Sequence, residues 1–221
     1  MQFPTFKYET DKHENGFTLV AGCDEVGIAP LAGPVVAAVV ILDRDSVNGR
    51  RTKSKWWHRV RDSKTVCEKE RGVLVDFIKE HCVAHALGIV SHETIDQINI
   101  YNATMSAMKQ ALFSLSVKPE FLFIDGKHRI KDLFDVKQQA VVDGDAKILS
   151  ISAASIIAKV ARDKIMNELH QTHPQYNFHL NKGYPTKFHR EALVKHGACS
   201  VHRRSFGLVQ QTFQQQLALS L

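Results

Sequence analysis

The chain has 221 residues, 44% of them hydrophobic, which is enough to bury a substantial core in one domain with a modest appendage. No apolar stretch approaches the length of a membrane span, and residues 1–16 do not resemble a signal peptide, so we expect a cytoplasmic protein without a membrane partner. The four cysteines form no Cys-x-x-Cys pair, which argues against a zinc cage or a disulfide framework, and the net charge of +6 favours a polyanionic partner such as nucleic acid. We also expect a monomer.

The first part of the chain predicts two buried strands, at residues 17–23 and 35–42. Residues 27–34 between them are rich in glycine and proline, which is typical of a turn, so we expect an antiparallel pair near the centre of a sheet. The polar and basic residues 43–61 predict an exposed loop. This loop carries Trp56 and Trp57, to which the sequence assigns no role.

From residue 68 onward, segments with helical and strand periodicity alternate. The predicted helices are residues 68–81, 93–115 and 148–170, and the predicted strands are residues 82–90, 120–124 and 136–142. The small residues early in the last helix allow close packing against a sheet. This order predicts an α/β protein with a mixed five-stranded sheet and helices on both faces.

From about residue 173 the chain is basic and helical or irregular. Its charges and interleaved aromatic residues favour a nucleic-acid-binding face, and the alternative is a solvated helical surface. The basic residues are Lys182, Lys187, Arg190, Lys195, Arg203 and Arg204, with His173, His179, His189, His196 and His202, and the aromatic residues are Tyr176, Phe178, Tyr184, Phe188 and Phe206. We therefore predict a catalytic domain at residues 1–172, a small basic substrate-binding segment at 173–209 and a flexible tail at 210–221.

Four carboxylates lie where predicted strands give way to turns: Asp24, Glu25, Asp125 and Asp145, each with a glycine nearby. An isolated Asp-Glu pair is more often part of a solvated turn. In an open α/β sheet, however, the ends of neighbouring strands meet at one crevice, so all four side chains can surround a single small volume. Asp143 reads as a turn carboxylate, and Asp163 as a helix-surface or ion-pair residue.

Such a set of oxygen ligands suits Mg²⁺ or Mn²⁺. Two ions about 4 Å apart can activate a water and stabilise the leaving oxygen in phosphodiester hydrolysis. The chain has no Gly-x-Ser-x-Gly, P-loop or His-Glu-x-x-His pattern, so a serine hydrolase, a P-loop nucleotidase and a zinc protease are not indicated.

Residues 24–27 and 30–38, Asp-Glu-Val-Gly followed by Pro-Leu-Ala-Gly-Pro-Val-Val-Ala-Ala, strongly resemble the first motif of the type 2 ribonucleases H, the bacterial ribonuclease HII family. Further segments that look like this family follow in order, at residues 62–64, 95–100, 124–126, 144–145, 152–163, 182–186 and 202–206. The resemblance therefore extends over most of the chain.

The resemblance implies a ribonuclease H-like fold and an endonuclease that cuts the RNA strand of RNA/DNA hybrids. It also implies cleavage on the 5′ side of ribonucleotides embedded in duplex DNA, as in ribonucleotide excision repair, leaving 3′-hydroxyl and 5′-phosphate ends. Asp24, Glu25, Asp125 and Asp145 match the metal-binding acids of the family. Matching substrate-binding positions are Ser63 and Lys64 at a phosphate, Lys182, Tyr184 at the ribose, and Arg203 and Arg204 as phosphate contacts or partners of surface acids.

One loop departs from the family pattern. The family has Gly-Arg-Gly, which contacts the ribose 2′-hydroxyl chiefly through backbone groups, whereas this chain has Gly27-Ile28-Ala29. A cationic side chain is lost and a glycine gains a Cβ. We therefore predict weaker activity on a single embedded ribonucleotide, relative to a longer hybrid, than the family pattern implies.

The last six residues carry a separate pattern. Gln216, Leu217, Leu219 and Leu221 fit the Gln-Leu-x-Leu-x-Leu pattern of bacterial sliding-clamp binding peptides, and the alternative is an amphipathic last turn packed on its own domain. For the whole chain, the alternatives to a ribonuclease HII activity are a related ribonuclease H with altered junction specificity and a non-catalytic hybrid-binding or clamp-associated module.

Overall fold

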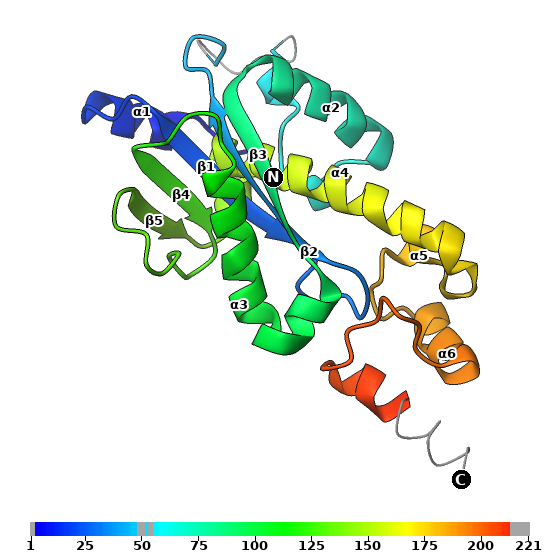
Figure 1. Ribbon diagram of the computed structural model, residues 1–221. Helices are drawn as coiled ribbons and strands as arrows, with labels where there is room; N and C mark the ends of the chain where they lie inside the picture. The colour runs from blue at the N-terminus through cyan, green and yellow to red at the C-terminus, as the bar shows by residue number, and fades with distance from the viewer. Residues whose placement is uncertain (1–2, 48–51, 53–54, 213–221) are drawn as a thin grey trace. The chain divides into compact units, whose positions relative to one another are not determined.

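The computed structural model describes residues 3–47, 52 and 55–212 (Figure 1). Its sheet has five strands in the order β3-β2-β1-β4-β5. At the centre, β1 (Val20–Val26) pairs antiparallel with β2 (Val35–Leu42) and parallel with β4 (Phe121–Asp125). On one side β4 pairs parallel with β5 (Lys137–Val141), and on the other β2 is followed by β3 (Cys82–Val90). The predicted mixed sheet and its central antiparallel pair are confirmed.

The composition of each strand matches its place in the sheet. All eight residues of β2, Val-Val-Ala-Ala-Val-Val-Ile-Leu, are buried, as expected for an interior strand covered on both faces. The edge strand β5, Lys-Gln-Gln-Ala-Val, has no fully buried residue, and charged or polar side chains on an edge discourage pairing with another chain. The burial of each strand thus follows from its side chains.

Helices form much of the rest of the described chain. Their ranges are α1 (Lys7–Glu14), α2 (Glu68–Glu80), α3 (His92–Phe113), α4 (Leu149–Thr172), α5 (Phe178–Asn181) and α6 (Lys187–His196). Among the described residues, no helix combines the length and the hydropathy that a membrane crossing requires. The sequence did not predict α1.

The long helix α3 is interrupted, which the sequence did not predict. Asn99 has φ 65° and ψ 165°, outside the helical range. Its Oδ1 accepts a hydrogen bond from the main-chain N of Asn102 at 3.0 Å, so the asparagine caps the part of the helix that follows. A polar side chain with a local hydrogen bond therefore competes with the continuous helix that the apolar stripe favours.

Two expectations about the first part of the chain are corrected. The first strand begins and ends three residues later than predicted, so Asp24 and Glu25 lie within β1 and not after it. The connection at 43–61 is not simply an exposed loop. Trp57 is buried, and Trp56 stacks on His81 with ring centroids 5.0 Å apart, because two indole rings have more apolar surface than a solvated loop accommodates.

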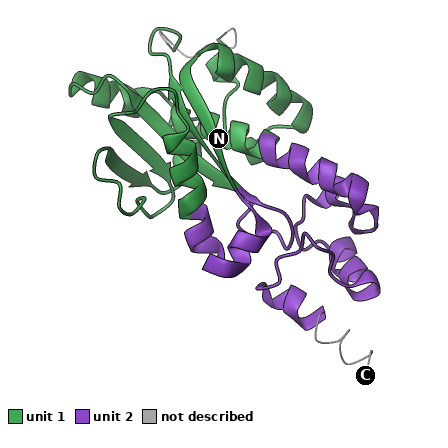
Figure 2. Cartoon of the chain, viewed as in Figure 1, with its two compact units in different colours: residues 1–26, 36–89, 105–160 green, residues 27–35, 90–104, 161–221 purple. Residues whose placement is uncertain are grey.

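The chain divides into two compact units (Figure 2). Unit 1 comprises residues 1–26, 36–89 and 105–160 and contains most of the sheet; unit 2 comprises residues 27–35, 90–104 and 161–221. Each unit has its own core. A cluster in unit 1 consists of Val20, Phe121, Phe123, Ile148 and Ile151, and the core of unit 2 consists of Leu31, Ala32, Met166, Tyr176, Phe178, Ala192, Leu193, Val201 and Val209. The functional division predicted at residues 172 and 209 stays a prediction.

Candidate active site

Three parallel strands of unit 1 end at the same edge of the sheet. Because β1, β4 and β5 run in the same direction, their carboxyl ends lie side by side (Figure 1). In the register, Cys23 is paired with Ile124, so the next residues along the two strands are Asp24 and Asp125. Asp125 is in turn paired with Val141 at the end of β5. Two of the four predicted acids therefore occupy neighbouring positions on adjacent strands.

The turn after β5 brings Asp145 to the same edge. The main-chain N of Gly144 donates to Oδ1 of Asp125 at 2.7 Å, which ties the turn to the end of β4. A Cβ at Gly144 would lie 2.7 Å from Cδ1 of Ile151 and 3.2 Å from Oδ1 of Asp125, so a larger residue there requires these side chains to shift. Asp143 before it is exposed and left-handed, with φ 54°, which agrees with its interpretation as a turn residue.

Asp24 is held from the helix side of the sheet. Gly22 lies two residues earlier on the same face of β1, and a side chain there would collide with the main chain of Ser150 and Ile151, so α4 begins in direct contact with the strand. One turn further along α4, the Ser155 side chain donates to the Asp24 carboxylate. The Ser155 hydroxyl is itself 2.9 Å from the hydroxyl of Ser63. Asp24 is thus buried in a defined orientation.

The acids disturb one another electrostatically. Burial raises the pKa of Asp24 well above its usual range, and the charges of Glu25 and Asp125 raise it further. Burial, followed by the charge of Asp125, raises the pKa of Glu25 to about 7. The pKa of Asp145 is also raised, first by burial and then by Asp125. The charges of these four side chains therefore interact, and their assignment as one site stays a prediction.

A cation is the natural complement of this cluster. Over the described residues, no three acidic, histidine or cysteine side chains already stand in a metal-ligating arrangement. The chemistry of the donor set nevertheless fits a hard divalent ion, because every donor is a carboxylate oxygen and the charge of Asp125 raises the pKa values of Asp24 and Glu25. Asp24, Glu25, Asp125 and Asp145 are therefore the candidate ligands for such an ion.

Of the predicted phosphate-contacting pair, only Lys64 is accessible. Its side chain is 78% exposed, its Nζ lies 4.0 Å from Oδ2 of Asp145, and its main-chain N donates to Oδ1 of Asp62. The Ser63 side chain is buried and pairs with Ser155, so the prediction that Ser63 contacts a phosphate is corrected. Ser63 instead links the Lys64 turn to the helix that orients Asp24.

The predicted ribose-binding loop lies in unit 2. Gly27 has φ 103°, and a Cβ there would lie only 2.8 Å from the main-chain oxygen of Pro34, so glycine is required. The side chain of Ile28 is 44% exposed and Ala29 is also exposed. Tyr184 is half-buried, and its carbonyl is 2.9 Å from Nδ1 of His189. Gly27 itself is buried, whereas Ile28, Ala29 and Tyr184 are at least partly accessible to a substrate.

The basic candidates of unit 2 fall into two groups. Arg204 is exposed, whereas Arg203 is completely buried and its guanidinium donates to main-chain carbonyls, so the prediction that Arg203 contacts phosphate or a surface acid is wrong. Lys182 is largely buried, with its Nζ 2.6 Å from Oδ1 of Asn167. The sequence pattern places Arg203 on the surface, but main-chain carbonyls that accept its hydrogen bonds allow it to be buried.

The interleaved histidines and aromatic residues also do not form a single exposed face. Tyr176, Phe178, His189 and His202 are buried, and the Nε2 atoms of the two histidines are 3.0 Å apart. Burial lowers the pKa of His202 to about 3, and burial likewise lowers the pKa of His189, so both rings are neutral and cannot attract phosphate. The exposed basic and aromatic positions are His179, Lys187, Phe188, Arg190, Lys195, His196 and Arg204.

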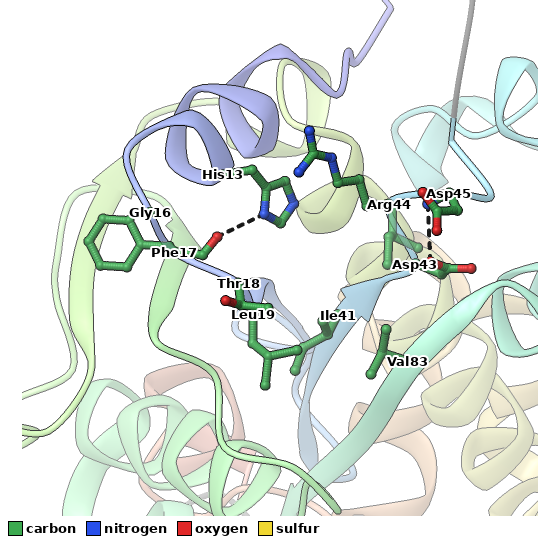
Figure 3. A pocket seen from close by; sticks show the side chains of 11 residues that line it. His13, Gly16, Phe17, Thr18, Leu19, Ile41, Asp43, Arg44, Asp45 and Val83 are labelled. Atoms are coloured by element: carbon green, nitrogen blue, oxygen red, sulfur yellow. Dashed lines mark hydrogen bonds between the residues drawn. The ribbon is translucent and has the colours of Figure 1, made fainter.

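A separate hollow of unit 1 lies near the opposite end of the central strands (Figure 3). Its lining includes His13, whose Nδ1 is 2.9 Å from the carbonyl of Phe17, together with Arg44 and the two acids Asp43 and Asp45. Residues 41 and 42 at the end of β2 also line it. Because β2 runs antiparallel to β1, this hollow is distinct from the carboxylate edge.

Residues 21–209 match the family model of ribonuclease HII. The chain is also 46% identical over 199 residues to the ribonuclease HII of Caldanaerobacter subterraneus subsp. tengcongensis, an alignment that covers 90% of this chain and 78% of that protein. The chain belongs to the ribonuclease HII family. Membership confirms the predicted enzyme class, an endoribonuclease, and supports ribonuclease H activity.

Solved structures agree on the fold of this ribonuclease HII family member. The ribonuclease H2 from Pyrococcus horikoshii OT3 is similar with a TM-score of 0.74 at 25% identity, covering 90% of this chain and 98% of that one. Bst-RNase HIII in complex with Mn²⁺ is similar with a TM-score of 0.68 at 17% identity, covering 92% of this chain and 71% of that one. The predicted ribonuclease H-like fold is confirmed.

Sequence reasoning missed three residues that the structure makes prominent: Asp96, Ser155 and Arg162. Asp96 accepts hydrogen bonds from the main-chain N of Arg204 and Ser205, Ser155 orients Asp24, and Arg162 is fully buried. All three lie in segments that resemble the family, which was the available signal. The predicted clamp-binding residues Gln216, Leu217, Leu219 and Leu221 lie outside the described residues.

Proposed function

We propose that this ribonuclease HII family member hydrolyses the RNA strand of RNA/DNA hybrids and cuts on the 5′ side of ribonucleotides embedded in duplex DNA, with Mg²⁺ or Mn²⁺ held by Asp24, Glu25, Asp125 and Asp145. The observation that carries the proposal is the meeting of buried Asp24 and its partly buried neighbours at one sheet edge, where burial and neighbouring negative charge raise the pKa values of Asp24 and Glu25. A site of this kind favours a bound cation. The Mn²⁺ in the solved Bst-RNase HIII complex supports the choice of metal.

Each residue around the site has a defined part in this proposal. When bound, divalent ions supply Lewis-acid stabilisation and lower the pKa of a water for phosphodiester hydrolysis. The Gly144 amide fixes the carboxylate of Asp125, and Ser155 fixes that of Asp24, so the acids are oriented before substrate arrives. Lys64, exposed beside Asp145, offers a positive charge to a substrate phosphate.

The substrate-binding part of the proposal rests on unit 2. Ile28, Ala29 and Tyr184 contact the sugar at the junction, and Arg204 with the other exposed basic residues binds the phosphate backbone. A monomeric state, a cytoplasmic location and a role in ribonucleotide excision repair belong to the same proposal. The buried residues Ser63, Lys182 and Arg203 are left out of direct contact with substrate.

The substitution Asp125→Asn tests the metal role directly. An asparagine oxygen can still accept the hydrogen bond from Gly144, so the turn is retained while one negative charge is removed. We expect cleavage of an RNA/DNA hybrid in Mg²⁺ or Mn²⁺ to be abolished, with a melting temperature in metal-free buffer no lower than that of the wild type. The matched control is Asp135→Asn, which removes an exposed acid paired with Lys118 at 3.2 Å and leaves cleavage intact. Substantial turnover by Asp125→Asn overturns the proposal.

We further propose, from the sequence alone, that Gln216, Leu217, Leu219 and Leu221 bind a bacterial sliding clamp. Spaced leucines fit apolar pockets in the manner of short peptide motifs. Clamp retention is compared between the full chain and a chain ending at Gln215. Equal retention of the two chains removes this part of the proposal.

A further inference from the structure

Two arginines in unit 2 are completely buried: Arg162 on α4 and Arg203 in the turn after α6. Arg203 donates to the carbonyls of Gly27 at 2.6 Å and Ile28 at 2.9 Å through its two terminal nitrogens. Its Nε donates to Gly33 at 3.0 Å, and its Nη2 also donates to Pro34 at 3.2 Å. One side chain thus holds both ends of the loop formed by residues 27–34.

Arg162 holds the same loop from a second direction. Its Nε donates to the carbonyl of Pro34 at 2.9 Å, and its Nη2 to that of Ala32 at 3.1 Å. Its Nη1 donates to the carbonyl of Lys182 at 2.9 Å, which connects the loop to the segment that carries Tyr184. The two guanidinium groups therefore fix the main chain of the loop through its oxygens.

Burial makes the charged form of both arginines less favourable. Burial, together with the charge of Arg162, lowers the pKa of Arg203 to about 9, and burial lowers the pKa of Arg162 to about 10. Both groups are still charged at neutral pH, so main-chain dipoles stabilise two neighbouring positive charges. Packing alone does not require buried charge, because apolar side chains of similar volume usually stabilise a core at least as well.

The orientation of the carbonyls also decides where the amides point. In a planar trans peptide, the C=O of one residue and the N–H of the next point in opposite directions. Because the carbonyls of Gly27 and Ile28 face Arg203, the N–H groups of Ile28 and Ala29 face away from it. Ile28 and Ala29, whose N–H groups these are, are also the two exposed residues of the loop.

The turn that carries Arg203 is itself held in place. Asp96 accepts from the main-chain N of Arg204 and of Ser205, both at 2.8 Å, and from the Ser205 hydroxyl at 2.6 Å. The main-chain N of Arg203 donates to the carbonyl of Leu31 at 2.8 Å. The loop and the turn are thus joined by main-chain and side-chain hydrogen bonds, none of which involves the side chains of residues 28 and 29.

We propose that Arg203, with Arg162, is a positioning residue for ribose recognition: it fixes the loop so that the N–H groups of Ile28 and Ala29 point outward as donors to a substrate sugar hydroxyl. The inference rests on the proposed function, because it assumes that this loop reads the ribose. It also explains how a loop with Ile28 and Ala29 in place of Arg and Gly keeps main-chain recognition. The arginine side chain of the family loop is lost and a Cβ is gained at residue 29, whereas the arginines that orient the main chain of the loop are present.

The test compares two substrates, a duplex with one ribonucleotide and a long RNA/DNA hybrid, and reports kcat and KM for each. Arg203→Gln removes most of the donors, and we expect the ratio of kcat/KM on the single ribonucleotide to that on the hybrid to fall at least tenfold. Arg203→Lys, which restores the charge and part of the hydrogen bonding, recovers part of the ratio. A merely structural role lowers both activities together and leaves the ratio unchanged.

Tyr176→Phe is the matched control, because it removes another buried hydrogen bond of unit 2, from the Tyr176 hydroxyl to the carbonyl of Gly197 at 2.7 Å, without touching the loop. It should reduce thermal stability and keep the ratio. If Arg203→Gln does not fold, Arg203→Lys and Asp96→Asn carry the test, and each should lower the ratio. An unchanged ratio in the folded variants, or a wild-type enzyme that cuts the hybrid but no single ribonucleotide, overturns the inference.

Failure of the proposed function gives a different result. If the wild-type chain cuts neither substrate, or if Asp125→Asn cuts the hybrid normally, the carboxylate mechanism is wrong whatever the arginine variants do. If Asp125→Asn is inactive on both substrates and the Arg203 variants keep the wild-type ratio, only the positioning role is wrong.

Discussion

The carboxylate edge of unit 1 and the arginine-held loop of unit 2 deal with buried charge in opposite ways. At the edge, burial and the charges of neighbouring acids, Asp125 among them, raise the pKa values of Asp24, Glu25 and Asp145. In the loop, Arg162 and Arg203 direct their guanidinium groups at main-chain carbonyls. The first site gathers like charges, whereas the charges of the second site have their partners within the chain.

This difference separates the two tasks of a nuclease. A site that gathers like charges favours a cation and the phosphate chemistry that the cation supports. A site whose charges are satisfied internally gains rigidity, which suits the recognition of a sugar by fixed main-chain groups. Substitutions in the two sites should accordingly have different signatures in activity and in stability.

The largest effect is expected from Asp24→Asn. Removing one of the crowded charges should reduce cleavage by roughly a thousandfold or more, because metal binding and orientation are both lost. The same change should raise the free energy of unfolding in metal-free buffer by about 1 kcal/mol, since a neutral amide is easier to bury. Urea unfolding and a hybrid-cleavage assay measure the two quantities.

Asp76→Asn, at an exposed position on α2, is the control and should change neither quantity. If Asp24→Asn instead lowers the free energy of unfolding of the metal-free protein while it impairs cleavage, repulsion between the acids does not destabilise the protein. The contrast between the two sites would then be lost.

A smaller effect is expected from the double substitution Ile28→Arg with Ala29→Gly, which restores the family loop. Because Arg203 already orients the main chain, the added arginine supplies a cationic donor and the glycine allows closer approach. Cleavage at a single ribonucleotide should rise roughly threefold to tenfold, with cleavage of a long hybrid unchanged. A parallel change on both substrates, or no change on either, contradicts the role of this loop.

The sequence predicted the carboxylate edge but not the arginine-held loop, for a physical reason. Acids at strand ends with glycines beside them have a local signature, and the parallel strands that gather Asp24, Asp125 and Asp145 follow from the alternation of strands and helices. The burial of Arg203 depends on carbonyls about 170 residues earlier in the chain, which no local pattern reveals. A buried arginine and a phosphate-binding arginine look the same in sequence.

The same limit applies to the aromatic residues and histidines of unit 2. Interleaved with basic residues, Tyr176, Phe178, His189 and His202 resemble a binding surface, but they pack into a core. Strand positions were predicted well where burial was continuous, as in β2. The shift of β1 by three residues arose because Asp24 and Glu25 look like turn residues although they lie in a strand.

Acid should weaken unit 2 through His202. Burial lowers the pKa of this ring from 6.5 to about 3, so the unfolded chain takes up the proton first. The contribution of the neutral ring to stability is complete above pH 6.5 and is lost as the pH falls toward 3, by at most about 1.4 kcal/mol per pH unit. Urea unfolding at several pH values should show a shallower acid loss for His202→Gln than for the wild type. Equal slopes contradict the assignment.

The smallest effect concerns Glu9 in unit 1. Its contribution to stability decreases as the pH rises, whereas that of His202 decreases as the pH falls. Burial raises the pKa of Glu9 to about 7, and its Oε1 accepts from the main-chain N of Ser150 at 2.8 Å. The contribution of the protonated form is complete below pH 4.5 and is lost as the pH rises to about 7. Glu9→Gln, which stays neutral, should therefore be about 1 kcal/mol more stable than the wild type at pH 8 and no more stable at pH 4.5. A wild type that is the more stable protein at pH 8 contradicts this account.

Titration calorimetry of Mn²⁺ binding to the full chain most directly tests whether the carboxylate edge binds a divalent cation. The wild type should bind Mn²⁺, Asp125→Asn should lose this binding, and Arg203→Gln should keep it, because the cation is proposed to bind at the carboxylate edge. Mn²⁺ binding that is unchanged in Asp125→Asn, or lost in a folded Arg203→Gln protein, would contradict the account.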